Sequence, residues 1–448
     1  MAYSLHRKQS VGVIGAGLSG IAAAIRLQEK GYRVQLFERE AQVGGKCLTH
    51  DLLHGDQVYP IDMGATVVAL SFQKVLSLAK EVDAPMSIPN PYKIIDKNGL
   101  ISSLREYYWR GGRKLDLIHQ FLTYLFQVRS FHKNYVTKTG YRAKIPYLYR
   151  MPFAQYCHER GLSDILPWFD LPVAAWGYKT PEDLPTWYVM GEVDVLGLIG
   201  LFMTILKGKS QFVKTFSHGY GQLAAELAAH YDLDIQLNDA VTAIRRDSEG
   251  VEIESRSGKA YFDFVILSNP QLVSILADPS PAERTFFDDL QFAPYANVLC
   301  RLSKPIDAKL LVEPNLRQQS RIRMIAAPYE NVPLVVCYLS IEKNSDAYSV
   351  EAIVERDLAL LGIELEEIHK TRIWNNYFPH FSSFNGYEAL LAAQGENRTL
   401  YVGAINQFEF TEASVSTAIH LVDKHFPDLH SLSSKYFSWL HNLQYWFK

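Results

Sequence analysis

The sequence has little of what would stabilise a disulfide-rich protein or anchor a membrane-spanning one. Its 448 residues include four cysteines, with neither CxxC nor zinc-ligand spacing, so we expect a reducing compartment, the cytoplasm. Lysine and arginine, 45 together, nearly balance 48 acidic residues, and the net charge of −3 predicts no nucleic-acid partner. The apolar run Val195–Leu206, twelve residues long, is too short to cross a bilayer. The length suits two or three domains, although no linker divides them.

The most informative segment that is present is a strand–turn–helix–strand pattern near the start. The apolar strand Val11–Ile14 runs into the turn GAGLSG at residues 15–20, and a second strand, Val34–Phe37, ends at Glu38. The three glycines would make a tight turn, let the backbone approach a pyrophosphate, and let helix and strand pack closely. Glu38 is placed to accept hydrogen bonds from both ribose hydroxyls, and its charge disfavours a 2′-phosphate. The pattern predicts a dinucleotide site that is not of the NADP type.

Further motifs recur along the chain. They are ERx4GGK at residues 38–46, DMGA at 62–65, VTAI at 241–244 and LYVG at 400–403. Together they resemble the glutathione-reductase-like flavoproteins of the amine oxidase and phytoene desaturase superfamily, which implies FAD as the cofactor. The residues that the resemblance and the glycine turn imply as FAD contacts are Gly15, Gly17, Leu18, Ser19, Gly20, Glu38, Arg39, Gly44, Gly45, Lys46, Met63, Gly64, Ala65, Val241, Gly403, Ala404 and Val415.

These motifs predict an α/β fold, in which a Rossmann FAD-binding domain is interleaved with an α+β substrate domain. The FAD-binding domain is expected from residues 1–84, 212–290 and 386–425, and the substrate domain from 85–211 and 291–385. A cleft between two such domains commonly holds a small-molecule substrate. The aromatic tail at 426–448 is expected to dock on its own protein, with a lipid or subunit interface as the alternative.

The first segment of the substrate domain, residues 85–211, is an insertion in the FAD-binding domain and carries the information on substrate specificity. Residues 117–158 contain no Asp or Glu, but six Lys or Arg residues interleaved with aromatic ones. This basic block suits an anionic amphiphile, a membrane face or a phosphate-rich partner, or it is a solvated face with an aromatic underside. The run Val195–Leu206 could line a substrate tunnel, dip into a membrane or form an ordinary buried helix. We expect an apolar or amphiphilic, fatty-acid-like substrate, with peripheral membrane contact left open.

Two short segments narrow the resemblance. AAWGY at 174–178 and WNNYFPH at 374–380 are similar to segments of the FAD-dependent polyunsaturated fatty acid double-bond isomerases. That resemblance implies hydride transfer to flavin N5 and back to a different carbon, with aromatic faces stabilising an allylic cation. It places Trp176, Tyr178, Tyr377 and Phe378 near the reacting carbon, with His380 donating a hydrogen bond or positioning water.

Alternatives to this reading remain open. The YFPH run could be a packed strand end with a satisfied histidine. The enzyme could instead be an oxidase or desaturase with net redox chemistry, or the chain could be a flavin-holding interaction protein without turnover. The chain also departs from the family pattern, because Ala404 stands where an acid is expected, so Asn406 or Glu409 would substitute. Pro91–Lys93 stands where the family has an arginine, so Lys93 or the basic block would hold a substrate carboxylate.

Overall fold

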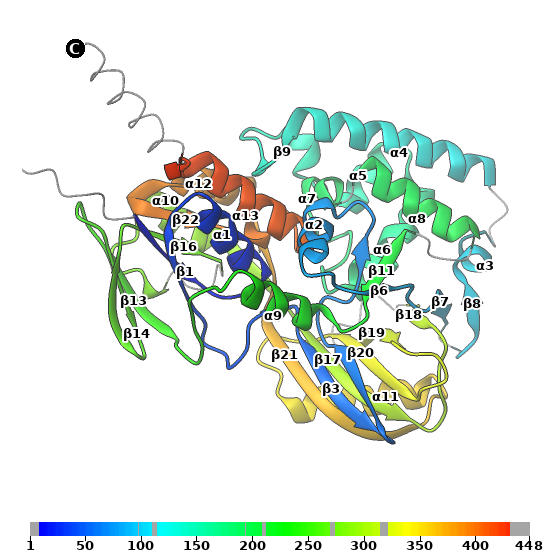
Figure 1. The fold of residues 1–448 in the computed structure, drawn as a ribbon. Coiled ribbons are helices and arrows are strands. Elements are labelled where there is room, and N and C mark those ends of the chain that lie inside the picture. Colours follow the sequence, from blue (N-terminus) through cyan, green and yellow to red (C-terminus); the bar gives the residue numbers. More distant parts are fainter. Residues whose placement is uncertain are drawn as a thin grey trace, which may run out of the picture.

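A five-stranded parallel sheet carries the glycine turn (Figure 1). The computed structural model describes residues 9–96, 98–109, 114–192, 194–207, 212–268, 274–313 and 321–430. The strands of this sheet, in spatial order, are β12 (Ile235–Gln236), β2 (Arg33–Phe37), β1 (Ser10–Ile14), β16 (Phe264–Leu267) and β22 (Thr399–Tyr401). Helices α1 (Leu18–Glu29) and α13 (Thr411–His425) pack against each other beside it. Sheet and helices draw on three separate parts of the chain.

A seven-stranded sheet forms the second part of the molecule. Its strands, in spatial order, are β21 (Leu365–Phe381), β17 (Leu290–Leu302), β20 (Leu334–Ser340), β19 (Arg321–Ala326), β18 (Lys309–Val312), β7 (Tyr92–Ile95) and β8 (Ile101–Ser103). All pairs are antiparallel except β7 with β18. Helix α11 (Ala347–Leu360) covers one face, and the other face joins the central core, so β20 reads as a continuous apolar run. The predicted fold class, a Rossmann-like domain interleaved with a second domain, is confirmed; the predicted domain boundaries stay a prediction.

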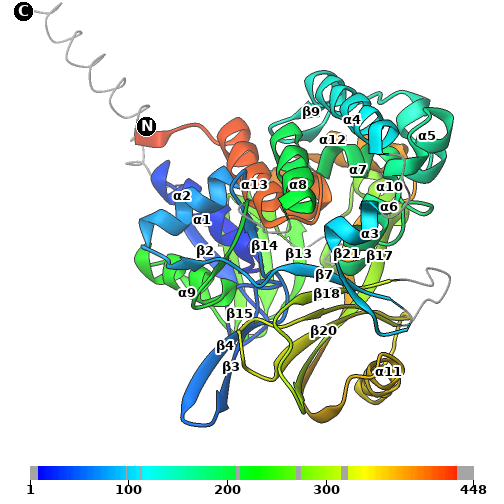
Figure 2. The same cartoon turned by 90° about the vertical axis from the view of Figure 1, so that its right-hand side faces the viewer.

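Helices from the first insertion form a layer above this sheet (Figure 2). They are α3 (Leu104–Trp109), α4 (Lys114–Tyr135), α5 (Phe153–Glu159), α6 (Pro167–Ala175), α7 (Thr186–Glu192) and α8 (Val195–Lys207). Most aromatic side chains of the basic block are buried or half-buried, although Phe126 and Tyr147 are exposed. Its cations are exposed apart from Arg150, which is half-buried. Within the described part of the chain, no helix combines the length and the apolar character needed to cross a membrane. Residues 431–448 of the predicted aromatic tail lie outside the described residues.

Smaller elements connect these layers. The remaining strands are β3 (Thr49–His54), β4 (Gln57–Asp62), β5 (Val68–Ala69), β6 (Met86–Ser87), β9 (Val136–Thr137), β10 (Gly140–Tyr141), β11 (Val213–Phe216), β13 (Val241–Arg246), β14 (Val251–Ser255) and β15 (Gly258–Phe262). The remaining α-helices are α2 (Gln73–Glu81), α9 (Tyr220–His230), α10 (Pro281–Asp289) and α12 (Phe384–Ala393).

Candidate active site

The glycine turn leaves the N-terminal amides of α1 without a side-chain cap. Gly17 occupies the N-cap position in an extended conformation, with φ −68° and ψ 168°. A Cβ on Gly20 would lie 2.1 Å from the carbonyl oxygen of Gly15, so this glycine permits the close packing of helix and turn. By contrast, the nearest protein atoms to a Cβ on Gly17 are 4.0 Å away. The space beside Gly17 is therefore open to a ligand, and uncapped helix amides favour an anionic one.

The GGK and DMGA motifs pack backbone to backbone around the same opening. The Gly44 N–H donates to the Ala16 carbonyl at 2.8 Å. A Cβ on Gly64 would lie 1.9 Å from the Lys46 carbonyl oxygen, so only glycine fits there. Glu38 is buried, and its carboxylate accepts the N–H groups of Ala16 at 2.8 Å and Glu40 at 3.0 Å. Glu38 thus fixes the turn, while its contact with a ribose stays a prediction.

One cavity of about 1410 Å³ runs from this turn to helix α8. Most of the predicted FAD contacts line it, but five of them do not. Those lining it are Gly15, Gly17, Leu18, Ser19, Glu38, Arg39, Gly44, Gly45, Lys46, Gly64, Ala65 and Ala404. Those not lining it are Gly20, Met63, Val241, Gly403 and Val415.

Close packing within the protein explains the positions of these five residues, as already described for Gly20. Met63 and Val415 are fully buried core residues, and Val241 is half-buried at the start of β13. Gly403 has φ +97°, and a Cβ there would lie 3.2 Å from the Ser19 hydroxyl oxygen, so it allows the chain to pass close to the turn.

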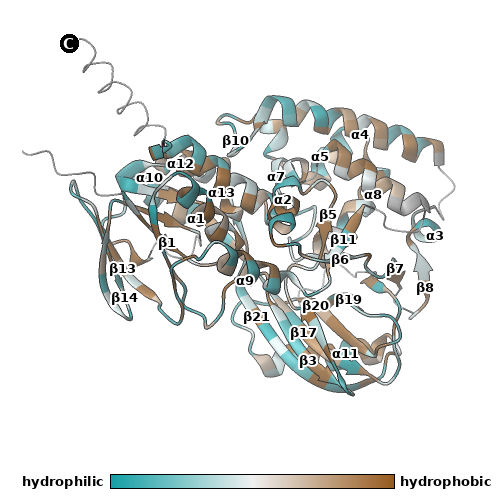
Figure 3. Cartoon of the chain, viewed as in Figure 1, coloured by the Kyte–Doolittle hydropathy of each residue, from teal (hydrophilic) through white to brown (hydrophobic). Residues whose placement is uncertain are grey.

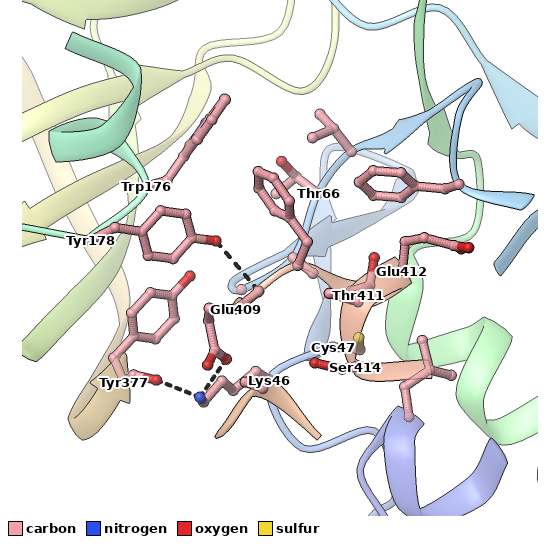
Figure 4. A pocket seen from close by; sticks show the side chains of 18 of the residues that line it. Lys46, Cys47, Thr66, Trp176, Tyr178, Tyr377, Glu409, Thr411, Glu412 and Ser414 are labelled. Carbon is pink, nitrogen blue, oxygen red and sulfur yellow. Dashed lines mark hydrogen bonds and ion pairs between the residues drawn. The ribbon is translucent and has the colours of Figure 1, made fainter. Parts of the chain in front are cut away.

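An aromatic wall borders the cavity between the two domains (Figure 4). Trp176, Tyr178 and Tyr377 all line it. The rings of Tyr178 and Tyr377 are stacked at 6.3 Å with an interplanar angle of 13°, and the ring of Tyr377 is also stacked with Tyr295, at 4.9 Å. Three of the predicted aromatic site residues are therefore brought together.

Phe378 and His380 lie elsewhere. Both are buried, and neither lines the cavity. Side chains alternate between the faces of a strand, so β21 directs Tyr377 and Pro379 into the cavity and Phe378 and His380 away from it. His380 Nδ1 lies 3.1 Å from the Phe378 carbonyl oxygen, and burial with the nearby Lys179 charge lowers the pKa of His380 to about 4. Among the described residues, the buried Nε2 of His380 has no hydrogen-bond partner, and a catalytic role of this residue stays a prediction.

Lys46 is held in the cavity by an ion pair that joins distant parts of the chain. Its Nζ donates to the Glu409 carboxylate at 2.5 Å and to the Tyr377 carbonyl (Figure 4). Burial raises the pKa of Glu409, and the Lys46 charge opposes this rise. Of the two residues predicted to replace the acid missing at Ala404, Glu409 lines the cavity. The other, Asn406, is buried and donates to the Tyr401 carbonyl at 2.8 Å.

No sequence motif indicated a carboxyl group at the other end of the cavity. Glu192, at the end of α7, lines the cavity, and burial raises its pKa to about 8. Within the described part of the chain, its carboxyl group has no hydrogen-bond or ion-pair partner. His132 of α4 also lines the cavity there, and its Nε2 lies 2.8 Å from the Met190 carbonyl oxygen. Desolvation lowers the pKa of His132, so the imidazole is neutral at pH 7.

The predicted carboxylate-binding cations do not reach the cavity. Neither Lys93 nor any lysine or arginine of the basic block lines it, whereas Tyr92 does. The cations of the basic block thus face solvent while most of its aromatic side chains are buried or half-buried, and a membrane or phosphate-rich partner for this face stays a prediction. Helix α8, in contrast, lines the cavity through Leu196, Gly197, Ile199 and Gly200. The tunnel-lining interpretation of this apolar run is the one that the packing favours.

This arrangement of an open dinucleotide turn and an interdomain cavity can be compared with known proteins. Residues 13–82 match the family model of NAD(P)-binding Rossmann-like domains, and residues 188–380 match that of flavin containing amine oxidoreductases. A protein of Mycobacterium tuberculosis whose name places it with the flavin-containing monoamine oxidases is 27% identical over 289 residues. That match covers 60% of this chain and 58% of the relative. Flavin-containing amine oxidase B of Homo sapiens is 32% identical over 109 residues, 24% of this chain and 19% of that protein.

Solved structures share the fold over nearly the whole chain. A CLA-producing fatty acid isomerase from P. acnes superposes with a TM-score of 0.81 at 21% identity, covering 94% of this chain and 100% of that one. Cyclohexylamine oxidase from Brevibacterium oxydans IH-35A superposes with a TM-score of 0.69 at 14% identity, covering 93% and 98%.

The chain combines a Rossmann-like domain with a second domain, which is the mixed α/β fold of flavin amine oxidase structures. Its residues 188–380 match the flavin containing amine oxidoreductases, and its cofactor is FAD. The residues present fit this cofactor, because the uncapped amides of α1 and the open space at Gly17 accommodate a diphosphate.

Proposed function

We propose that the protein isomerises double bonds of a polyunsaturated, fatty-acid-like chain without net oxidation. The observation that carries this proposal is the apolar arm of the cavity, which continues from the wall of Trp176 and Tyr377 to α8. The arm is lined largely by apolar side chains such as Leu104, Trp168 and Met324. The 0.81 TM-score with a fatty acid isomerase supports the same reading, as do the WGY and YFPH segments.

In this proposal the chain orients the substrate, and FAD, when bound, would supply a group that can take up a hydride and give it back. Gly17 and the α1 amides would hold the FAD diphosphate, and Glu38 would hold its ribose. The faces of Trp176, Tyr178 and Tyr377 stabilise a delocalised allylic cation through their quadrupoles. Lys46 is fixed by Glu409 and the Tyr377 carbonyl, so its position at this wall is set before substrate binds. Closure of the site by both domains limits the access of water to the cation.

Anaerobic turnover tests this function. Purified holoenzyme given a linoleate-like substrate without oxygen or nicotinamide should produce conjugated-diene absorbance, because the hydride returns to the same molecule. Deuterium at the bridging methylene should be recovered at the new position by mass spectrometry. Trp176→Ala should lower kcat more than it weakens binding, since cation stabilisation matters in the transition state. Stoichiometric hydrogen peroxide, or loss of the label to solvent, would contradict isomerisation.

A second candidate, an amine oxidase with net redox chemistry, is favoured by Glu192. A buried carboxyl group without a cationic partner could pair with a substrate ammonium group. Amine-oxidising relatives and neighbours share the family and fold. The two functions demand opposite protonation states of Glu192, so this one residue distinguishes them.

The pH dependence of Glu192→Gln separates the candidates. Glu192 keeps its proton below its pKa of about 8 and loses it above. For an apolar substrate, the negative charge formed above this pH should weaken binding, roughly tenfold at about pH 9, one pH unit higher. Glu192→Gln should abolish that change while leaving the neutral-pH KM near the wild-type value. An amine substrate whose turnover is lost in Glu192→Gln would instead establish the oxidase.

A further inference from the structure

Large apolar side chains are exposed on two neighbouring helices of the insertion. On α4, Leu115, Leu122 and Phe126 are 83%, 58% and 75% exposed. On α8, Leu196 and Ile199 are 68% and 39% exposed. Isolated exposed apolar residues are ordinary, but a group on adjacent helices indicates an interaction surface. We refer to these five residues as the apolar rim.

The two helices lie together at an opening of the cavity. Phe121 of α4 and Phe202 of α8 are stacked at 4.4 Å, and Figures 1 and 2 both place the helices side by side. Leu196 and Ile199 line the cavity and are also exposed to solvent, so the cavity reaches the surface at the rim. A molecule that enters or leaves there passes the apolar side chains of Leu196 and Ile199.

Cations continue the exposed face of α4. Arg129 and Lys133 follow Phe126 at helical spacings of three and seven residues, and both are exposed. Figure 3 shows hydrophobic and hydrophilic residues together along this helix. Acids near these helices include Asp116, at the start of α4, and Asp164, whose Oδ2 accepts a hydrogen bond from the Gln120 side chain of α4. Asp194 Oδ1 accepts the Gly197 N–H as a cap of α8. The surface therefore combines exposed apolar groups with positive charge, in a protein whose net charge is −3.

We propose that the apolar rim docks on the surface of a membrane containing anionic lipids. Apolar side chains in the acyl boundary and cations at the phosphate level are the two contributions that hold an interfacial helix. A second copy of this chain is a less suitable partner. A two-fold symmetric contact would bring the positive charges of Arg129 and Lys133 close to the same residues of the other copy. Docking at the opening would let an apolar molecule move between bilayer and cavity without crossing water. Vesicle binding requires no turnover, so the proposal stands apart from the proposed reaction.

Vesicle flotation of the FAD-loaded protein tests this surface. The wild type should float with phosphatidylcholine–phosphatidylglycerol vesicles and bind more weakly to pure phosphatidylcholine. Phe126→Glu should lose this binding. Arg129→Gln with Lys133→Gln should weaken binding to the anionic vesicles roughly thirtyfold, while leaving the weak binding to phosphatidylcholine unchanged. Unchanged flavin absorbance and melting temperature would show that each variant is folded.

A matched control lies on the other side of the seven-stranded sheet. Leu360 of α11 is 72% exposed, so Leu360→Glu makes the same apolar-to-acidic change outside the rim and should bind like the wild type. Absence of wild-type binding to anionic vesicles would overturn the proposal, as would equal losses in Phe126→Glu and Leu360→Glu. If the wild type were a dimer that did not bind vesicles, and Phe126→Glu dissociated that dimer, the apolar rim would be a subunit interface and the proposal would fail.

Discussion

Gly17→Val should yield a folded, colourless protein that no longer binds FAD. Gly17 has an extended backbone that valine readily adopts, and no protein atom lies closer than 4.0 Å to the position of its Cβ. The added methyl groups would instead occupy the space beside the uncapped amides of α1, where the diphosphate is expected. The flavin absorbance of the purified protein and its titration with FAD measure the loss, while circular dichroism reports the fold.

Gly20→Val provides the contrast within the same turn. A Cβ there would meet the Gly15 carbonyl oxygen at 2.1 Å, so the turn itself has to move, and we expect lower thermal stability even without FAD. If Gly17→Val protein retains full FAD and its yellow colour, the diphosphate lies elsewhere.

Arg246→Ala should lower the free energy of unfolding by about 3–5 kcal/mol, because it removes one partner of a buried ion pair. The guanidinium of Arg246 binds both oxygens of Glu283, at 2.6 and 2.9 Å, and the Thr399 hydroxyl at 2.9 Å. The side chains of Arg246 and Glu283 are 1% and 0% exposed. Tyr401 also donates to Glu283, so the pair ties β13, α10 and β22 together. Chemical denaturation of the FAD-loaded protein measures the change.

The neighbouring residue is the control for this prediction. Arg245, on the same strand as Arg246, forms surface ion pairs with Glu252 and Glu254 of the neighbouring strand β14, and its side chain is 53% exposed. Solvent and salt screen such pairs, so Arg245→Ala should change stability little. Because β22 leads directly to Gly403 and Ala404, Arg246→Ala should also release FAD more readily. Equal effects of the two substitutions would show that the buried network contributes no more than the surface pair.

Strand geometry alone divides the predicted site residues of the YFPH run into two sets. The sequence interpretation placed Tyr377, Phe378 and His380 at one site, although neighbouring residues of a strand point to opposite faces. Once YFPH is read as a strand, Tyr377 and Pro379 form one set and Phe378 and His380 the other. Only the fold, however, shows which set faces the cavity, since both faces of this strand end are covered.

The sequence by itself determined the features that depend on neighbouring residues. The glycine turn with its strand, its helix and Glu38 is a local unit, because backbone sterics and the helix N-terminus define it within a few residues. Periodicity likewise revealed α8, but left open whether it lined a tunnel, entered a membrane or was simply buried.

Tertiary structure alone decided which distant side chains meet and how they ionise. Lys46 and Glu409 are 363 positions apart, so no local pattern links them. The pKa of Glu192 depends on the water that surrounding helices exclude, which the sequence around it does not encode. The cations of the basic block lie outside the cavity for the same reason: packing buried most of its aromatic side chains against the core and left the cations in solvent. Sequence specifies a local conformation, whereas long-range packing sets the dielectric environment and the partners of each group.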